Sequence, residues 1–358
     1  MKLLVTGGAG FIGSAFIRYV HGNSDASIVN VDALTYAAVP AALDEIARSP
    51  RYRFEKADIA DARAMRAIIE THRPSAIINF AAETHVDRSI DRPAAFIRTN
   101  VVGTTTLLDT AREYWDGLPP AEREAFRFHH VSTDEVFGSL APNEPAVSEN
   151  ATYRPNSPYA ASKAAADHLV RAWHRTYGLP IVLSNASNNY GPWQFPEKLI
   201  PLTIRKALAG EKLPVYGTGA NIRDWLHVDD HARGLWLVLT RGRIGESYNI
   251  GGGSERTNLQ VVEAICDLIE ESTPGPKTGR PLRDLIEFVP DRPGHDFRYA
   301  LDTSKIAHAL GWRPTETFES GLAKTVRWYV DNEAALRGIW SASYGGERLG
   351  FRQAGRVR

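Results

Sequence analysis

The chain has very little cysteine. Cys266 is the only one among 358 residues, which excludes an intrachain disulfide and a zinc site built from several cysteines. Neither charge is in excess, with 42 Lys plus Arg against 42 Asp plus Glu and no basic stripe, so nucleic acid and anionic membranes are poor candidates for partners. Long apolar runs are also missing, because Leu3-Leu4-Val5 is far too short for a signal peptide or a membrane span and no other segment qualifies. We expect a cytoplasmic enzyme without a metal site.

The composition that remains is ordinary for a globular protein, 43% apolar and 23% charged, in a chain long enough for one large domain or two intimate ones. Up to about residue 190, strand-like and helix-like patterns alternate, which predicts an α/β fold with a doubly wound parallel sheet of the Rossmann type. The expected strands are Lys2–Thr6, Ser27–Val31, Tyr52–Glu55, Ala76–Phe80, Phe126–Val131 and Pro180–Ser184. The expected helices are Phe11–His21, Asp61–His72, Pro93–Trp115 and Ser157–Tyr177.

Beyond about residue 190, Gly and Pro become frequent and the alternation ends, which predicts a smaller, loop-rich lobe. Its expected helices are Glu197–Ala209, Asp229–Thr240, Asn258–Glu271 and Phe318–Val330. We therefore expect a first domain over residues 1–190, to which some later segments return, and a second lobe over residues 191–335. Residues 336–358, rich in Gly and Arg toward their end, are expected to form a peripheral tail.

The segment from Thr6 to Gly13 joins the first expected strand to the first expected helix and has glycines at positions 7, 8, 10 and 13. Glycines at this spacing allow a tight turn and close approach of the backbone to a pyrophosphate at the helix N-terminus. The segment therefore predicts a dinucleotide site, and the alternative is a Gly-rich turn that binds nothing.

Carboxylates follow the second and third expected strands. Asp32 stands where a carboxylate binds ribose hydroxyls and repels a 2′-phosphate, which favours NAD over NADP, unless it is only a turn residue. Asp58 and Ile59 stand where an adenine edge can be bound. The alternative is that Asp58 caps the next helix, but Asp61 competes for that position.

Tyr159 and Lys163 are four residues apart in the helix expected over Ser157–Tyr177, so they lie on one of its faces. On that face the ammonium can lower the pKa of the phenol and make it a base for a sugar hydroxyl. The pair therefore predicts hydride transfer to or from a sugar carbon.

Thr133, Asp134 and Glu135 come just after the expected strand Phe126–Val131. A carboxylate beside a carboxylic acid splits the two pKa values, so that one group accepts and the other donates a proton at neutral pH. Together with Tyr159 and Lys163, the pair Asp134 and Glu135 predicts oxidation followed by elimination. The alternative is a solvated turn after a strand.

Further blocks support these motifs in a specific order, covering the chain to about residue 335. They are Asn79–Glu83, Ala81–Ser89, Ser132–Gly138, Ser187–Pro192, Phe195–Pro201, Arg223–Trp225, Asp230–Arg233 and Asp291–His295. With them the chain resembles the extended short-chain dehydrogenase/reductases and, within these, the dTDP-glucose 4,6-dehydratase family. The resemblance implies an NAD-binding domain over residues 1–190 and a nucleotide-sugar-binding lobe over residues 191–335.

The resemblance also implies a reaction without net oxidation. Tyr159 takes the proton of the sugar 4-hydroxyl while NAD takes the hydride from C4, and Thr133 contacts the 4-oxygen. Glu135 then removes the C5 proton and Asp134 protonates the departing 6-hydroxyl. The hydride returns to C6 and a proton to C5, which gives a 4-keto-6-deoxy sugar nucleotide. Lys163 holds the nicotinamide ribose as well.

Binding residues are likewise implied position by position. On the NAD side they are Gly7, Gly10, Phe11, Ile12, Gly13, Asp32, Ala33, Leu34, Thr35, Asp58, Ile59, Phe80, Ala81, Ala82, Thr99, Tyr159, Lys163 and Asn189. On the dTDP-glucose side they are Thr84, Thr133, Asn188, Lys198, Leu199, Pro214, Tyr216, Arg223, Asn258, Arg292 and His295. Lys198, Arg223 and Arg292 also suit a diphosphate on chemical grounds, although a single Arg is more often a surface residue.

Several alternatives stay open at this point. A 4-epimerase or a UDP-glucuronate decarboxylase needs NAD and the Tyr/Lys pair but not Asp134 and Glu135, whereas a CDP- or UDP-glucose 4,6-dehydratase shares all of them. A protein that binds NAD without catalysis is a more distant alternative. The apolar stripes of the helices expected over Pro93–Trp115 and Ser157–Tyr177 suggest a homodimer, because related enzymes pair two such helices across a two-fold axis. The base specificity and the downstream pathway are not legible from spacing.

Overall fold

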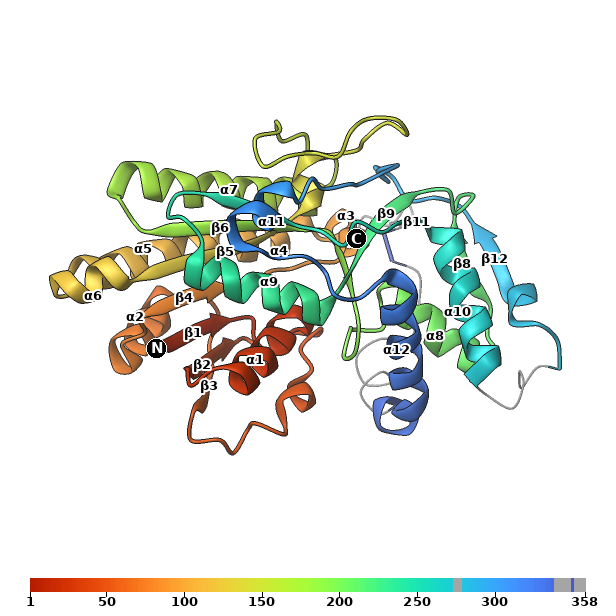
Figure 1. Cartoon of the computed structure of the whole chain (residues 1–358), viewed down its shortest axis with the longest axis horizontal. Helices are drawn as coiled ribbons and strands as arrows, with labels where there is room; N and C mark the ends of the chain where they lie inside the picture. The colour runs from red at the N-terminus through yellow and green to blue at the C-terminus, as the bar shows by residue number, and fades with distance from the viewer. Residues whose placement is uncertain (273–278, 338–348, 351–358) are drawn as a thin grey trace, which may run out of the picture.

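A seven-stranded parallel sheet forms the centre of the larger part of the molecule in the computed structural model, which describes residues 1–272, 279–337 and 349–350 (Figure 1). The strands lie in the order β10-β6-β5-β4-β1-β2-β3. Their bounds are β1 Lys2–Thr6, β2 Ser27–Asp32, β3 Tyr52–Lys56, β4 Ala76–Asn79, β5 Arg127–Thr133, β6 Ile181–Ala186 and β10 Ser247–Ile250. The order reverses between β1 and β4, and ligands of such sheets bind beyond the carboxyl ends of the strands at this point.

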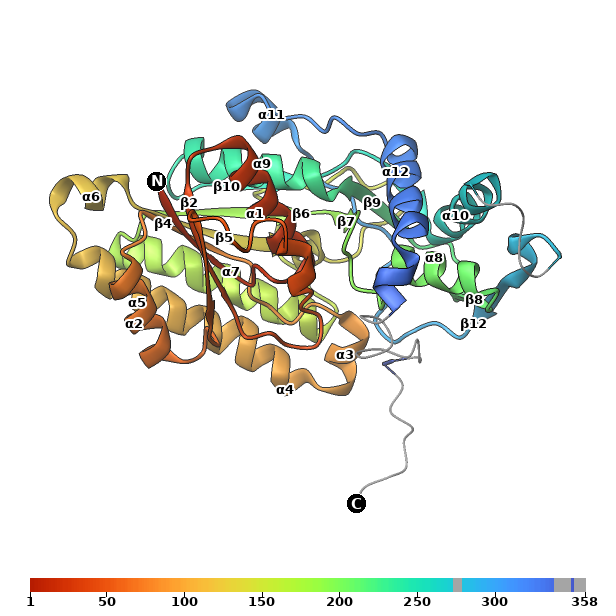
Figure 2. The same cartoon turned by 90° about the horizontal axis from the view of Figure 1, so that it is seen from below.

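Helices cover both faces of the sheet (Figure 2). One face carries α1 (Phe11–Asn23), α9 (Val228–Arg241) and α11 (Ser304–Leu310), and the other carries α2 (Ala62–His72), α5 (Thr104–Asp116) and α7 (Pro158–Tyr177). Successive residues of a strand point to opposite faces, so Leu3 and Val5 of β1 join the core under α1 and α9, whereas Leu4 joins the core under α2, α5 and α7.

The helix expected over Pro93–Trp115 is interrupted. It begins as α4 (Pro93–Phe96), passes through a π-helical segment, Ile97–Gly103, and continues as α5. The short helices α3 (Val86–Asp91) and α6 (Pro120–Ala125) flank this region in the chain. π-helical turns are rare and often occur near functional sites, and Thr99 in this one belongs to the predicted NAD contacts.

A smaller part carries the remaining elements, on the right of Figure 1. Its helices are α8 Leu199–Ala209, α10 Asn258–Ser272 and α12 Phe318–Asp331. Its strands are β7 Asn188–Tyr190, β8 Leu213–Tyr216, β9 Ile222–His227, β11 Glu255–Thr257 and β12 Ile286–Val289. Ile200, Ile265 and Leu322, one from each helix, meet in its core. Short 3-10 turns cover Pro40–Leu43, Asp134–Phe137 and Leu282–Leu285.

The fold class is confirmed, as are the expected strands and helices to within a few residues at their ends. One placement is wrong. The helix expected over Asp229–Thr240 was assigned to the second lobe, but it is α9, which packs on α1 and the sheet through Leu235 and Val238. An amphipathic pattern shows that a helix has a buried face but not which element covers it. The domain bounds stay a prediction, and most of the expected tail lies outside the described residues.

No helix among the described residues is long and apolar enough to cross a membrane.

Candidate active site

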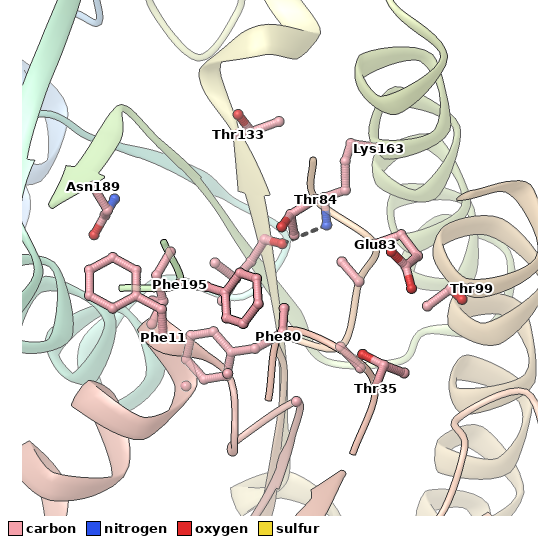
Figure 3. Close-up of a pocket in the computed structure, with 18 of the residues that line it drawn as sticks. Phe11, Thr35, Phe80, Glu83, Thr84, Thr99, Thr133, Lys163, Asn189 and Phe195 are labelled. Carbon is pink, nitrogen blue, oxygen red and sulfur yellow. Dashed lines mark hydrogen bonds between the residues drawn. The ribbon is translucent and has the colours of Figure 1, made fainter. Parts of the chain in front are cut away.

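A cavity lies beyond the carboxyl ends of β1, β4 and β5, where the sheet order reverses (Figure 3). The segment after β1, the ends of β2 and β5, and the start of α7 all contribute to its wall. In Figure 3, Lys163 reaches into the cavity from α7 and Thr133 stands at the end of β5. Phe11 and Phe80 also belong to the wall. Segments far apart in the chain therefore converge on one site.

The glycine-rich turn after β1 is held by close backbone contacts. Gly7 has a φ of +69°, and a Cβ there would lie 2.6 Å from the amide nitrogen of Ala81. A Cβ on Gly13 would lie 2.3 Å from the carbonyl oxygen of Gly7. The cap of α1 is Gly10, which has no side chain to compete with a ligand for the first N–H groups of the helix. This turn suits the pyrophosphate of a dinucleotide.

Asp32 ends β2 at the wall of the cavity and is 9% exposed. Its Oδ2 accepts from the Ala9 N–H at 2.9 Å and its Oδ1 from the Leu34 N–H at 2.8 Å. Burial raises the pKa of this carboxyl, while the two backbone hydrogen bonds lower it. Asp32 thus joins the turn after β1 to the turn after β2, at the position where a ribose is expected.

Asp58 lines the cavity and does not cap α2. The cap is Asp61, whose side chain accepts from the N–H groups of Arg63 and Ala64. Asp58 Oδ1 accepts from the Ala60 N–H at 2.9 Å and Asp58 Oδ2 lies 3.5 Å from Arg98 Nη2, so the carboxylate is held at the cavity wall, where the adenine interpretation places it.

The end of β5 brings Thr133, Asp134 and Glu135 into the cavity wall. Asp134 is only 3% exposed, so this segment is not a solvated turn. The Thr133 hydroxyl lies 3.2 Å from Asp134 Oδ1, and Asp134 Oδ2 is buried with no hydrogen-bond partner among the described residues. A buried carboxyl oxygen without a partner favours the protonated acid.

The two adjacent carboxyls have different surroundings. Burial, and then the neighbouring Glu135, raise the pKa of Asp134 well above its ordinary value. Burial also raises the pKa of Glu135, but three cations, Arg292, Lys198 and Arg223, oppose that rise. Asp134 is therefore suited to donate a proton and Glu135 to accept one.

Tyr159 and Lys163 lie in the first two turns of α7. The helix is capped by Ser157, which accepts from the Ala160 N–H at 3.0 Å. Burial, and then Glu135, raise the pKa of the Tyr159 phenol, while a hydrogen bond with Thr133 lowers it. Burial lowers the pKa of Lys163 to about 8. The phenol pKa is thus raised by burial and by Glu135 in this structure, and a lowering of that pKa by the Lys163 ammonium stays a prediction.

Most residues predicted to bind the cofactor line the cavity, and only Leu34 of that set does not. Leu34 has a φ of +54° and contributes its N–H to Asp32 instead. Of the residues predicted for the sugar nucleotide, the cavity is lined by Thr84, Thr133, Asn188 and Lys198. The others in that set lie outside its lining: Leu199, Pro214, Tyr216, Arg223, Asn258, Arg292 and His295.

Several of these outer residues nevertheless surround Glu135 through their charges. Arg292 and Arg223 both lower its pKa. Arg292 is held by Asp87, and the Arg223 guanidinium lies 4.4 Å from the centre of the Tyr299 ring. These cations extend the site from the cavity toward the smaller part of the molecule.

Sequence reasoning missed a cluster of charged residues at the cavity wall. Glu83 and Glu197 line the cavity, and Glu197 is 6% exposed. Arg88 Nε donates to Glu197 Oε2 at 2.8 Å, and the Tyr36 hydroxyl donates to Glu197 Oε1 at 3.0 Å. Glu83 and Glu197 lie within blocks that carry the resemblance, but spacing alone gave neither a role.

This chain resembles known sugar-nucleotide 4,6-dehydratases by family, by sequence and by structure. Residues 4–325 fit the family described as GDP-mannose 4,6 dehydratase. The chain is 56% identical to the dTDP-glucose 4,6-dehydratase of Neisseria meningitidis serogroup B, over 98% of this chain and 99% of that protein. It is also 56% identical to dTDP-glucose 4,6-dehydratase 1 of Escherichia coli K12, over 96% of this chain and 97% of that protein. The crystal structure of the Streptomyces venezuelae dTDP-glucose 4,6-dehydratase with NAD bound matches 95% of this chain and all (100%) of that one, with a TM-score of 0.85 and 45% identity.

Proposed function

The chain belongs to the GDP-mannose 4,6 dehydratase family and, within it, to the dTDP-glucose 4,6-dehydratases, and from this premise we propose that it converts dTDP-glucose to dTDP-4-keto-6-deoxyglucose and water. The reaction is that of a hydro-lyase with NAD as the cofactor. NAD, when bound, accepts the hydride of C4 and later supplies a hydride to C6. Gly7, Gly10 and Asp32 would hold its pyrophosphate and ribose.

The side chains divide the proton transfers among them. Burial favours the neutral phenol of Tyr159, so it first loses its own proton, and as the phenolate it then receives the proton of the sugar 4-hydroxyl. Thr133 orients the phenol oxygen through their hydrogen bond. The C4 ketone acidifies the proton on C5, which Glu135 removes. Asp134 gives its proton to the 6-hydroxyl as the C6–O bond breaks, so water leaves. Glu135 returns a proton to C5 as C6 is reduced.

The observation that carries this proposal is the contrast between Asp134 and Glu135. Asp134 is buried with an unpartnered Oδ2, whereas Glu135 faces three cations. A 4-epimerase or a UDP-glucuronate decarboxylase has no proton to deliver to a 6-hydroxyl, so neither needs this pair.

The test is incubation of the purified protein with dTDP-, UDP-, CDP- and GDP-linked hexoses in deuterated water, followed by mass spectrometry. We expect loss of one water from dTDP-glucose with deuterium at C5. The same loss from a different nucleotide sugar would retain the mechanism and overturn the substrate. An isomerised or decarboxylated product without loss of water would overturn the roles of Asp134 and Glu135.

We propose further that the protein is a homodimer paired through α5, α7 and the π-helical segment Ile97–Gly103. Two apolar side chains support this, because Ile97 is 48% and Val102 is 50% exposed on that segment. Apolar surface left exposed on a helical segment can mark an interface. The cytoplasmic location stays a prediction, which fractionation of cells that produce the protein would check.

A further inference from the structure

A third ionisable side chain continues the row of Tyr159 and Lys163 along α7. Asp167 lies one turn beyond Lys163 on the same face of α7. This helix packs on β5 and β6 (Figure 1). Tyr159 and Lys163 line the cavity, but Asp167 does not, and it is 0% exposed. The proton transfers described above leave this buried carboxylate without a role.

Asp167 is a carboxylate with several donors around it. Its Oδ2 accepts from the Ser132 hydroxyl at 2.8 Å, from the Tyr153 hydroxyl at 2.9 Å and from Asn185 Nδ2 at 3.4 Å. Its Oδ1 lies 3.4 Å from Nε2 of His130. These donors, together with the charge of Lys163, outweigh burial and hold the pKa of Asp167 below its ordinary value. A charge is retained at this depth because donors surround it.

The ring of His130 lies close to both Asp167 and Lys163. Thr6 donates to Asn79 Oδ1 at 2.6 Å, which leaves the Asn79 amide nitrogen to donate to His130 Nδ1 at 3.2 Å. Nδ1 is then the acceptor of the ring, so the ring proton is on Nε2, which faces Asp167 Oδ1. Lys163 Nζ lies 3.4 Å from the same Nε2. With the ring proton on Nε2 both groups are donors, so Asp167 acts on Lys163 through its charge and not through a chain of hydrogen bonds.

Lys163 Nζ is fixed by a hydrogen bond to the carbonyl oxygen of Val131 at 2.8 Å. The titratable groups around it are His130 on β5 and, on α7, Tyr159 and Asp167. His130 is neutral because burial lowers its pKa to about 4, and Tyr159 is neutral because burial raises its pKa. Asp167 is thus the anion of this set.

Asp167 also holds the end of β5, which carries Thr133, Asp134 and Glu135. Ser132 precedes Thr133 in β5, and Asn185 Nδ2 donates both to Asp167 and to the Thr133 carbonyl oxygen, the latter at 3.0 Å. The Asp167 carboxylate therefore contacts His130, which lies beside Lys163, and Asn185, which binds the Thr133 carbonyl.

We propose that Asp167 is a positioning residue for the dehydration: its buried charge keeps Lys163 protonated at the cavity, and its hydrogen bonds fix the end of β5 that bears Thr133, Asp134 and Glu135. This rests on the proposed function of Lys163. Asp167 itself touches neither the cavity nor a reacting atom.

The experiment compares Asp167→Asn, which removes the charge and retains the shape, with Tyr153→Phe, which removes one donor to the same Oδ2 and leaves the charge. The protonation of Lys163 is followed by the NMR shift of its ¹³Cε in protein freed of NAD, with Lys163→Arg identifying the signal. The alkaline limb of kcat with dTDP-glucose and the melting temperature are measured on the same variants.

In Asp167→Asn we expect Lys163 to titrate roughly one pH unit lower or more, since that is the usual effect of losing a nearby opposite charge, with the alkaline limb of kcat moving in the same direction. In Tyr153→Phe, the titration of Lys163 and the alkaline limb of kcat should stay at the same pH as in the wild type. If both variants lose activity or stability while the Lys163 titration stays in place, Asp167 is only structural and the proposal is overturned.

A second variant covers the case in which Asp167→Asn does not fold, and the NMR titration covers the case in which the wild type is inactive. If Asp167→Asn does not fold, Asp167→Ser retains an oxygen acceptor without the charge and carries the same expectation. The NMR titration needs no turnover, so it tests Asp167 even if wild-type protein fails to dehydrate dTDP-glucose, a failure that would count against the proposed function alone.

Discussion

Arg292 Nη1 donates to Asp87 Oδ1 at 2.8 Å and so joins the segment after β12 to α3. The Asp87 side chain is 5% and the Arg292 side chain 16% exposed, so the pair is largely shielded from water. Asp87 Oδ2 also accepts from the Tyr216 hydroxyl at 2.9 Å. One carboxylate thus orients two residues that are predicted to bind the sugar nucleotide.

Replacing Asp87 should weaken substrate binding more than it slows the chemistry. In Asp87→Asn the charge that holds Arg292 is lost while an acceptor for Tyr216 remains, and we expect KM for dTDP-glucose to rise about tenfold, equivalent to roughly 1.4 kcal/mol, with kcat little changed. The matched control is Asp267→Asn, since Asp267 pairs with Arg283 on the surface with side chains 46% and 48% exposed. Equal KM values for the two variants would contradict a role of Asp87 in binding.

Glu135→Gln should separate oxidation from elimination. The amide cannot remove the C5 proton, so we expect overall turnover to fall about 10²- to 10⁴-fold, the usual contribution of a general base. C4 oxidation relies on Tyr159, so single-turnover absorbance at the wavelength of NADH should still rise. Intact turnover, or loss of the NADH signal together with turnover, would show that Glu135 does not act at C5.

Elimination should depend on pH at both ends. Glu135 works as the carboxylate, so its raised pKa means that the rate falls as pH drops through that value. Asp134 works as the acid, so the rate falls as pH rises through its own, more strongly raised pKa. Loss of the Lys163 proton, whose pKa is about 8, contributes to the same alkaline limb. The result is a bell-shaped profile of kcat whose acidic limb lies above the ordinary range of a Glu. A rate that stays flat down to the ordinary Glu range would contradict this assignment.

The parts of this protein that the sequence predicts are local. The turn from Gly7 to Gly13 is legible because its glycines are required by contacts within a few residues and with Ala81. The helix that carries Tyr159 and Lys163 is legible because Ser157 and Pro158 start it and Gly178, with a φ of +77°, ends it. Such features depend on residues that are close in the sequence, so they can be predicted without knowledge of the fold.

The parts that were missed depend on tertiary contacts. Asp87 and Asp167 look like ordinary polar residues of helices, and only burial against distant partners gives them a role. Asp87 meets Arg292, which is 205 positions away, and Asp167 meets Ser132, which is 35 away. The partner of α9 was misjudged for the same reason, since its pattern fits either lobe. No spacing rule covers contacts of this kind.

Gly7→Ala should abolish cofactor binding. Its Cβ would lie 2.6 Å from the Ala81 nitrogen at a φ of +69°, so the turn would have to shift away from the pyrophosphate position. We expect purified Gly7→Ala to contain little NAD and to melt at a lower temperature. The control is Gly22→Ala near the end of α1, where nothing lies within 4 Å of the added Cβ. There, stability should rise by about 0.5–1 kcal/mol. Wild-type NAD content in Gly7→Ala would overturn the assigned site.

Val102→Glu should dissociate the proposed dimer. Val102 is 50% exposed on the π-helical segment between α4 and α5, and a carboxylate there would face its counterpart, or apolar surface, across a two-fold axis. Burying an unpaired charge in such an interface is unfavourable by several kcal/mol, so we expect monomers at micromolar concentration in sedimentation velocity. Phe288→Glu is the control, because Phe288 is 56% exposed on β12, away from these helices. If the wild type sediments as a monomer, the dimer itself is excluded. If the wild type and both variants sediment as dimers, the interface lies on another face.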